Sequence, residues 1–224
     1  MKRFALTTAA AAIAALGFAG SAQAGSPDGK LQVKLLATAV LPDGKVDAGS
    51  PNFGLTGLNT KANDNVVPTV AIEYFFTPNI SAETICCFTG HHVSVTSPAG
   101  TVYEHAIDHV LVLPATLTLK FHLPVGGIKP YVGAGVTEFF FLGEHRGSDL
   151  PGAVTSAKLD NAFGGVVQAG VDIPINNKGM SISLDAKRYF VRPRSHFFAG
   201  TTEVISAQHK LDPWVISGGV AYRF

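Results

Sequence analysis

Beyond residue 24 the sequence has no apolar run near the ~20 residues that a membrane-spanning helix needs. Its only cysteines, Cys86 and Cys87, are adjacent. Neighbouring side chains on a strand point to opposite faces, so a disulfide between these two would be strained. Their spacing does not fit a zinc site either. A disulfide framework is therefore excluded, and another feature must hold the fold together.

An excess of basic residues is also missing. The 17 Lys and Arg residues include Lys2 and Arg3 at the amino terminus, which leaves 15 against 16 Asp and Glu. Because a nucleic-acid-binding protein needs a basic face, we expect no nucleic-acid partner. Hydrophobic residues nevertheless make up 46% of the chain. An apolar chain without a spanning helix is typical of a transmembrane β-barrel; a soluble β-sandwich is the alternative.

The amino terminus has the pattern of a secretory signal peptide. Lys2 and Arg3 are followed by the apolar run 4–19 and by Ala22-Gln23-Ala24, the small residues that signal peptidase requires. We predict cleavage after Ala24, so that residues 1–24 are the signal peptide and residues 25–224 form one barrel domain. A membrane anchor is the alternative, but the run is short for a span.

Alternation of apolar and polar residues with a period of two predicts eight strands. Short turns and long polar connections alternate between them, as in an outer-membrane barrel with short periplasmic turns and four longer external loops. The predicted fold is therefore an all-β, eight-stranded antiparallel transmembrane β-barrel with both termini in the periplasm. The predicted strands are Leu31–Leu41, Val66–Phe76, Ile80–Val93, Ile107–Leu123, Ile128–Phe141, Leu159–Ile173, Met180–Val191 and Pro213–Phe224, and the long loops lie near 42–65, 94–106, 142–158 and 192–212.

Charged residues inside the predicted strands are assigned to the lumen, where charges can pair instead of facing hydrocarbon. The set consists of Lys34, Glu73, Glu83, Lys120, Asp172, Asp185 and Lys187. Gly133 and Gly135 leave the fifth strand without a face signal, and we predict Tyr131 outward and Glu138 inward. The predicted channel-lining residues are Leu36, Phe75, Ile85, Val215, Glu73, Glu83 and Lys120.

Aromatic residues gather at two heights on the predicted outer face, as amphipathic rings do at membrane interfaces. The chain ends on Phe224, with Tyr222 on the same face, which is typical of the signal that barrel-assembly machinery recognises. The predicted interface aromatics are Tyr74, Phe76, Phe121, Tyr131, Trp214, Tyr222 and Phe224, with Phe88, Phe139, Phe163 and Phe190 also assigned to the external height.

Four stretches match one known family: 73–80, 113–122, 129–136 and 212–224. Through them the chain resembles the outer membrane protein W family, which includes hydrophobic-compound importers of the alkane-uptake type. The resemblance implies an eight-stranded barrel with a narrow, largely apolar lumen. It also implies that small hydrophobic molecules enter from outside and leave sideways into the membrane. The sequence departs from the family at residues 31–34, where members often carry a tryptophan, and in the external loops.

An eight-stranded barrel is just wide enough inside for side chains or one small ligand, which excludes a wide aqueous pore. We predict a narrow channel for small hydrophobic solutes, with apolar walls toward the loops and a charged plug toward the periplasm. Proline cannot donate to a strand ladder. Pro68 and Pro114 therefore mark either a lateral gap or simple bulges. No cofactor is expected.

Three alternatives stay open. The loops can serve as a receptor or adhesion surface, in which case the barrel has a structural role without transport. Ser195, His196 and Glu203 are the residue types of a serine hydrolase, which raises a lipid-modifying enzyme as the second alternative. They lie in a predicted loop without a hydrolase motif, so no enzyme is expected. A loop metal site is the third, and no metal is expected because nothing fixes its geometry; its histidines are His91, His92, His105 and His109.

The expected partners are those of any outer-membrane barrel, namely membrane lipid, barrel-assembly machinery and the hydrophobic solute. Arg146, Lys158 and Arg188 lie near the predicted external rim. Because Arg and Lys form charge-assisted hydrogen bonds with phosphate, these three can pair with lipopolysaccharide.

Overall fold

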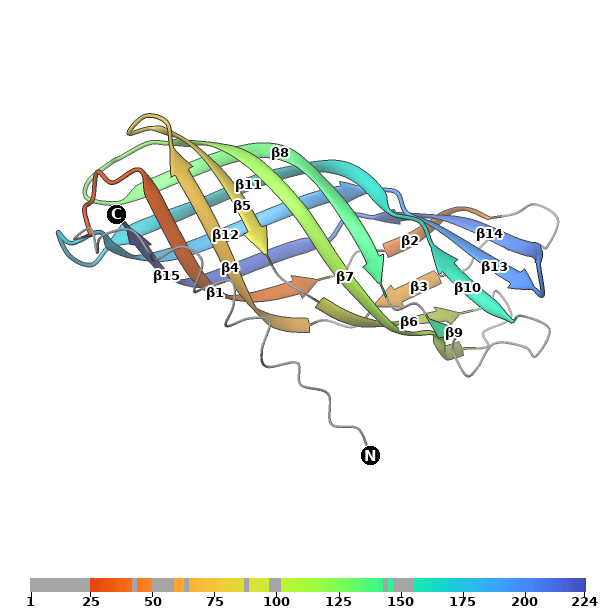
Figure 1. The fold of residues 1–224 in the computed structure, drawn as a ribbon. Coiled ribbons are helices and arrows are strands. Elements are labelled where there is room, and N and C mark those ends of the chain that lie inside the picture. Colours follow the sequence, from red (N-terminus) through yellow and green to blue (C-terminus); the bar gives the residue numbers. More distant parts are fainter. Residues whose placement is uncertain are drawn as a thin grey trace.

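The protein is a closed antiparallel barrel whose strands run obliquely around one axis (Figure 1). The computed structural model describes residues 25–41, 44–49, 59–62, 65–86, 89–96, 102–142, 145–146 and 155–224. The ring of paired strands is β1 (Leu31–Leu41), β4 (Asn65–Phe75), β5 (Ile80–Cys86), β7 (Val102–His122), β8 (Lys129–Leu142), β11 (Ala162–Pro174), β12 (Met180–Val191) and β15 (Trp214–Arg223). Since β15 pairs with both β12 and β1, the ring closes and confirms the predicted eight-stranded barrel.

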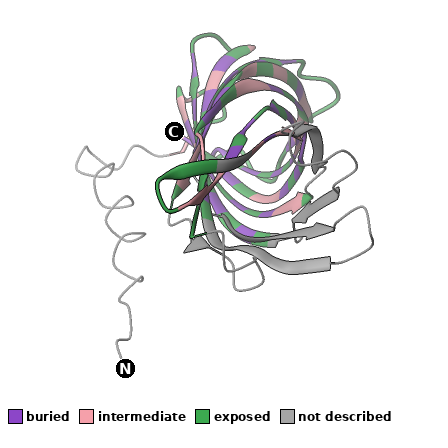
Figure 2. Ribbon diagram, turned by 90° about the vertical axis from the view of Figure 1, so that its right-hand side faces the viewer, coloured by how far each residue is buried: buried purple, intermediate pink, exposed green. Residues whose placement is uncertain are grey.

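Buried and exposed residues alternate along the strands around the whole ring (Figure 2). On β12, for example, Ile182 and Leu184 are exposed whereas Ser183 and Asp185 are buried. The outward face is thus apolar and the inward face carries the polar groups, which is the reverse of a water-soluble protein. Within the described residues, no helix is long and apolar enough to cross a membrane.

The two described termini and the short turns lie at one end of the barrel (Figure 1). The hairpin between β7 and β8 is closed by backbone bonds between Val125 and Ile128. Gly126 and Gly127, between them, have φ angles of 59° and 87°, as a two-residue hairpin loop of the primed type requires. The amide of Leu31 donates to the carbonyl of Phe224, which joins the amino-terminal segment to the last strand.

The predicted long loops contain strands, which corrects the sequence-based boundaries. The strand predicted over 80–93 is divided into β5 and β6, and the one predicted over 159–173 begins later, as β11 at Ala162, with Leu159 as the last residue of β10. These strands extend the barrel wall outside the apolar belt, where the outward side chains need not be apolar. Their polar composition therefore made them look like loops in the sequence. The additional strands are β2 (Gly44–Gly49), β3 (Asn59–Ala62), β6 (Thr89–Thr96), β9 (His145–Arg146), β10 (Ser156–Leu159), β13 (Arg194–Ala199) and β14 (Thr202–Leu211).

The facing predicted for the fifth strand was wrong. Tyr131 is only 2% exposed and Phe139 6%, whereas Glu138 is exposed. Cross-strand partners share a face, and Tyr131 pairs with the buried His122. Tyr131 and Phe139 therefore point into the lumen and do not belong to the interface aromatics. Of the other predicted interface rings, Phe224 is half-buried and those exposed on the outer face are Tyr74, Phe76, Phe121, Phe163, Phe190, Trp214 and Tyr222; Phe88 lies outside the described residues.

Candidate functional site: a lumen divided into a charged and an apolar half

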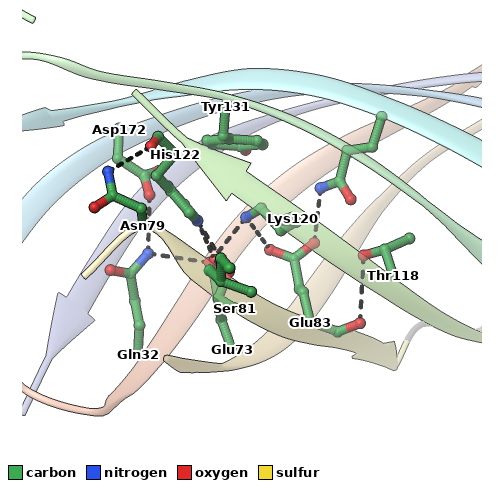
Figure 3. A network of polar contacts seen from close by, with 12 residues as sticks. Gln32, Glu73, Asn79, Ser81, Glu83, Thr118, Lys120, His122, Tyr131 and Asp172 are labelled. Carbon is green, nitrogen blue, oxygen red and sulfur yellow. Dashed lines mark hydrogen bonds and ion pairs between the residues drawn. The ribbon is translucent and has the colours of Figure 1, made fainter. Parts of the chain in front are cut away.

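A network of ion pairs fills the lumen on the periplasmic side (Figure 3). The Nζ atom of Lys120 lies 2.9 Å from Oε2 of Glu73 and 2.9 Å from Oε2 of Glu83. Lys34 contacts the same two carboxylates at 3.0 and 3.2 Å. β1, β4, β5 and β7 each supply one of these side chains, and all four side chains are almost fully buried. Two lysines thus share two carboxylates inside the barrel.

The network continues across the lumen to the opposite wall. Lys187 on β12 contacts Glu83 at 3.0 Å and Asp185 at 2.6 Å. Gln168 on β11 donates to both of these carboxylates, at 2.9 and 2.6 Å. Lys34 also reaches Asp172, at 3.5 Å. Strands from all around the ring are therefore tied together through their side chains.

Aromatic and imidazole rings complete the network toward the periplasm. Nε2 of His122 lies 2.8 Å from Glu73, and the hydroxyl of Tyr131 donates to Asp185 at 2.8 Å. The ammonium of Lys120 is 3.7 Å from the centroid of the Tyr131 ring, within range of a cation–π interaction. The guanidinium of Arg223 lies 3.5 Å from the ring centroid of Phe75. Together these groups form a polar plug, defined here as the charged network with its flanking rings.

The external half of the lumen is apolar. Its main cluster consists of Val112, Phe139, Ala162, Val166, Tyr189, Val191 and Val215. Hydroxyl pairs lie between this cluster and the plug, with Thr116 and Thr137 2.9 Å apart and Thr38 and Ser217 also 2.9 Å apart. A second, smaller cluster of Leu36, Val67, Ala71 and Ile85 lies on β1, β4 and β5. Polarity thus changes along the barrel axis within a single lumen.

All seven predicted channel-lining residues point into the barrel. Glu73, Glu83 and Lys120 form the plug, and Val215 belongs to the main apolar cluster. Phe75 instead packs beside Arg223 and His122 at the periplasmic end. That these residues line a solute path stays a prediction. Sequence reasoning missed Tyr131, Phe139 and Tyr189, because single aromatic residues on a strand of uncertain facing carry no signal until the neighbouring strand fixes their register.

The two prolines flank the strand formed by β5 and β6. Pairing of β4 with β5 ends at Val70, and Pro68 follows two residues beyond it. Pairing of β7 with β5 ends at Thr116, and Pro114 lies between this residue and Val112, where pairing with β6 resumes. Pro114 points into the lumen and Pro68 outward.

The family model described as the OmpW family matches residues 27–224. The chain belongs to the OmpW family. Among similar proteins, the outer-membrane protein y4mB of Sinorhizobium fredii is 30% identical over 86% of this chain and 79% of that protein. Outer membrane protein W of Escherichia coli is 28% identical over 79% of this chain and 81% of its own length. This OmpW-family chain is accordingly a protein of the outer membrane.

Solved structures show the same fold. The outer membrane protein OprG of Pseudomonas aeruginosa superposes with a TM-score of 0.75 at 18% identity, covering 89% of this chain and 98% of that one. The outer membrane protein AlkL, determined in lipid bilayers, gives a TM-score of 0.66 at 20% identity, covering 90% and 93%. At these identities the likeness supports the architecture alone.

The residues considered for a hydrolase are not assembled in this OmpW-family barrel. They lie on β13 and β14, not in a loop, and neighbours on a strand point to opposite faces. The hydroxyl of Ser195 lies 2.8 Å from Nε2 of His209 instead of contacting His196. His196 lies 3.0 Å from Asp160 and 3.2 Å from Glu203. The histidines considered for a metal lie on β6 and β7, where the side chains are outside the described part of the structure.

Proposed function

We propose that this barrel is a narrow channel for small hydrophobic molecules that enter from the external end and leave sideways into the membrane. The observation that carries the proposal is the division of the lumen. An apolar solute that enters the external half leaves water and contacts the main apolar cluster. This transfer is favourable by about 25 cal/mol for each Å² of apolar surface removed from water. Apart from the Tyr189 hydroxyl, the side chains of that cluster are hydrocarbon, with which an apolar solute can pack directly.

The plug argues against passage straight into the periplasm. Lys34 and Lys120 are held between the same carboxylates, and removing either cation leaves a buried negative charge without its partner. An apolar solute offers nothing to replace these contacts. The periplasmic half of the lumen is therefore expected to stay closed to an apolar solute. A solute in the external half needs another exit.

The wall beside Pro114 supports a lateral exit. Proline has no amide hydrogen, so this position on β7 cannot donate a backbone hydrogen bond to the neighbouring β5–β6 strand. The boundary between β7 and that strand is called the seam below. On the other side of the β5–β6 strand, Pro68 lies beyond the last residue of β4 that pairs with β5. The second apolar cluster contains Val67, the neighbour of Pro68, and Ile85 on β5. An apolar surface thus extends from the lumen toward the same stretch of wall.

The test is to restore the missing donor with Pro114→Ala and to measure the initial rate of uptake of a labelled alkane into proteoliposomes. We expect the rate to fall about fivefold, the equivalent of one backbone hydrogen bond of about 1 kcal/mol across the seam. Pro174→Ala, at the periplasmic end of β11, is the matched control and should leave the rate unchanged. Undiminished uptake by Pro114→Ala and by Pro68→Ala would remove the lateral exit. Uptake no faster than in liposomes without protein would remove transport and favour a role for the external surface alone.

A further inference from the structure

Three arginines lie along the outward face where β12 passes into β13. Buried and exposed residues alternate without interruption through this passage, with Tyr189, Val191 and Pro193 buried. The outward positions are consequently Arg188, Phe190, Arg192 and Arg194. Alternate residues on a strand are about 7 Å apart. The face is thus a ladder of guanidinium groups with one aromatic ring between them.

The ladder lies at the external boundary of the apolar belt. Phe163, Phe190 and Trp214 are 71%, 44% and 46% exposed and occupy the external ends of β11, β12 and β15. Exposed aromatic rings at such a height mark the membrane interface. The guanidinium of Arg188 lies 5.2 Å from the ring centroid of Trp214, and Arg192 and Arg194 follow Phe190 in the external direction. These cations are therefore at the level of the lipid headgroups.

Basic residues outnumber acidic ones around this face. Asp160 lies beside Arg194, whose carbonyl accepts a hydrogen bond from the Asp160 amide, and its carboxylate is 3.0 Å from His196. Lys158 on β10 lies opposite His196 of β13, and Lys158 and Arg194 are both exposed. In the part of the chain that the structure describes, neither has a carboxylate within 4.0 Å. Asp212 is shared by Arg192, at 2.7 Å, and Lys210, at 3.5 Å.

From this arrangement we propose, independently of transport, that the face formed by Arg188, Arg192, Arg194 and Lys158 binds the phosphate groups of lipopolysaccharide. Guanidinium groups bind phosphate with paired, charge-assisted hydrogen bonds, and the interleaved Phe190 offers an apolar contact for an acyl chain. The lipid A part of lipopolysaccharide combines two phosphates with acyl chains in the leaflet that this end of the barrel meets.

The site differs from the set that sequence alone indicated. Arg146 lies on β9, which pairs with β7 at Ile107. The side chain of Arg146 lies outside the described residues, so its pairing with phosphate stays a prediction. Arg192 and Arg194, assigned to a loop by the sequence, belong to the face.

Binding of bisphosphorylated lipid A to the full barrel in detergent micelles, followed by native mass spectrometry, tests the proposal. We expect the double variant Lys158→Gln/Arg194→Gln to bind about tenfold more weakly, since each loses charge-assisted bonds to phosphate. The matched control Lys30→Gln/Lys178→Gln removes two exposed lysines at the periplasmic end and should bind as the parent protein does. Arg194→Lys, which keeps the charge without the paired geometry, should fall between them.

Three results would overturn the proposal. The first is unchanged lipid A affinity of the double variant, with folding verified by heat-modifiable migration in gels. The second is equal binding of lipid A from which the phosphates have been removed. The third is an equal loss of phosphatidylglycerol binding, which would reduce the site to general attraction for anionic lipid.

Discussion

The two halves of the lumen are built on the same eight strands and differ in almost every other respect. On the periplasmic side, four carboxylates surround three lysines, and each ammonium contacts at least two carboxylate oxygens. On the external side, valines and aromatic rings pack on each other. The same strand pairing closes the barrel around both halves, and only the inward side chains differ between them.

The comparison also separates two sources of stability. Burying charge is unfavourable unless every charge has partners, so the plug depends on its completeness. The stability of the apolar half depends on buried apolar area and on packing, so it decreases gradually as contacts are lost. A single substitution in the plug should consequently cause a large loss of stability. In the apolar half, a change of side-chain shape should have a small effect, whereas an introduced charge should have a large one.

The largest effect is expected from Lys120→Met, which leaves Glu73 and Glu83 with one shared cation fewer. Breaking a buried ion pair on one side costs about 3–5 kcal/mol, so the free energy of unfolding in urea should fall by that amount. Lys178→Met, at an exposed turn, is the control and should change it by less than about 0.5 kcal/mol. Equal stability of the two variants would show that the plug does not hold the barrel together.

The second effect, on transport, is expected from Val215→Asp in the apolar half. A carboxylate there lies among apolar groups, and its hydration water occupies the narrow lumen. The initial rate of alkane uptake should fall about tenfold, a barrier increase near 1.4 kcal/mol. Val215→Ala, which enlarges the same position without charge, should retain uptake. A Val215→Asp barrel that transports normally would contradict an apolar path through this cluster.

The smallest effect concerns the external β13–β14 hairpin, where burial lowers the pKa of His209 below its ordinary value of 6.5. The unfolded hairpin then binds a proton more readily than the folded one, so stability present at neutral pH is lost as the pH falls through about 6.5. The protection of the β14 amides, the ratio of the intrinsic exchange rate at each pH to the observed rate, should therefore fall by a few-fold between pH 7.5 and 5.5. His209→Gln should remove this dependence, and a dependence that persists in this variant would contradict its assignment to His209.

Much of the barrel was predictable from sequence because its signals are local. Alternation fixed β1 and β12 to the residue, and Glu73, Glu83 and Lys120 were assigned to the lumen because a charge on the other face would meet hydrocarbon. Gly133 and Gly135 removed that signal from β8. Only the register with β7, which puts Tyr131 opposite His122, decides that strand.

The external strands show a different reason for failure. β13 and β14 contain charged and aromatic residues without a continuous apolar face, so their pattern resembled a loop. Their pairing to each other and to the end of β12 is a property of the assembled barrel. The sequence did not reveal the arginine ladder at Arg192 and Arg194 for the same reason. The outward facing of these two residues follows only from the strand that precedes them.

The most direct test is methyl NMR of the isotope-labelled barrel in lipid bilayers with a protonated alkane added. A hydrophobic path inside the barrel predicts magnetisation transfer from the alkane to inward methyl groups of the external half, those of Val112, Val166, Val191 and Val215. Outward methyls of Val132, Val136 and Val220 report the membrane-dissolved alkane and serve as the reference. Transfer to both sets is the predicted result. Transfer to the outward set alone would contradict a hydrophobic path inside the barrel.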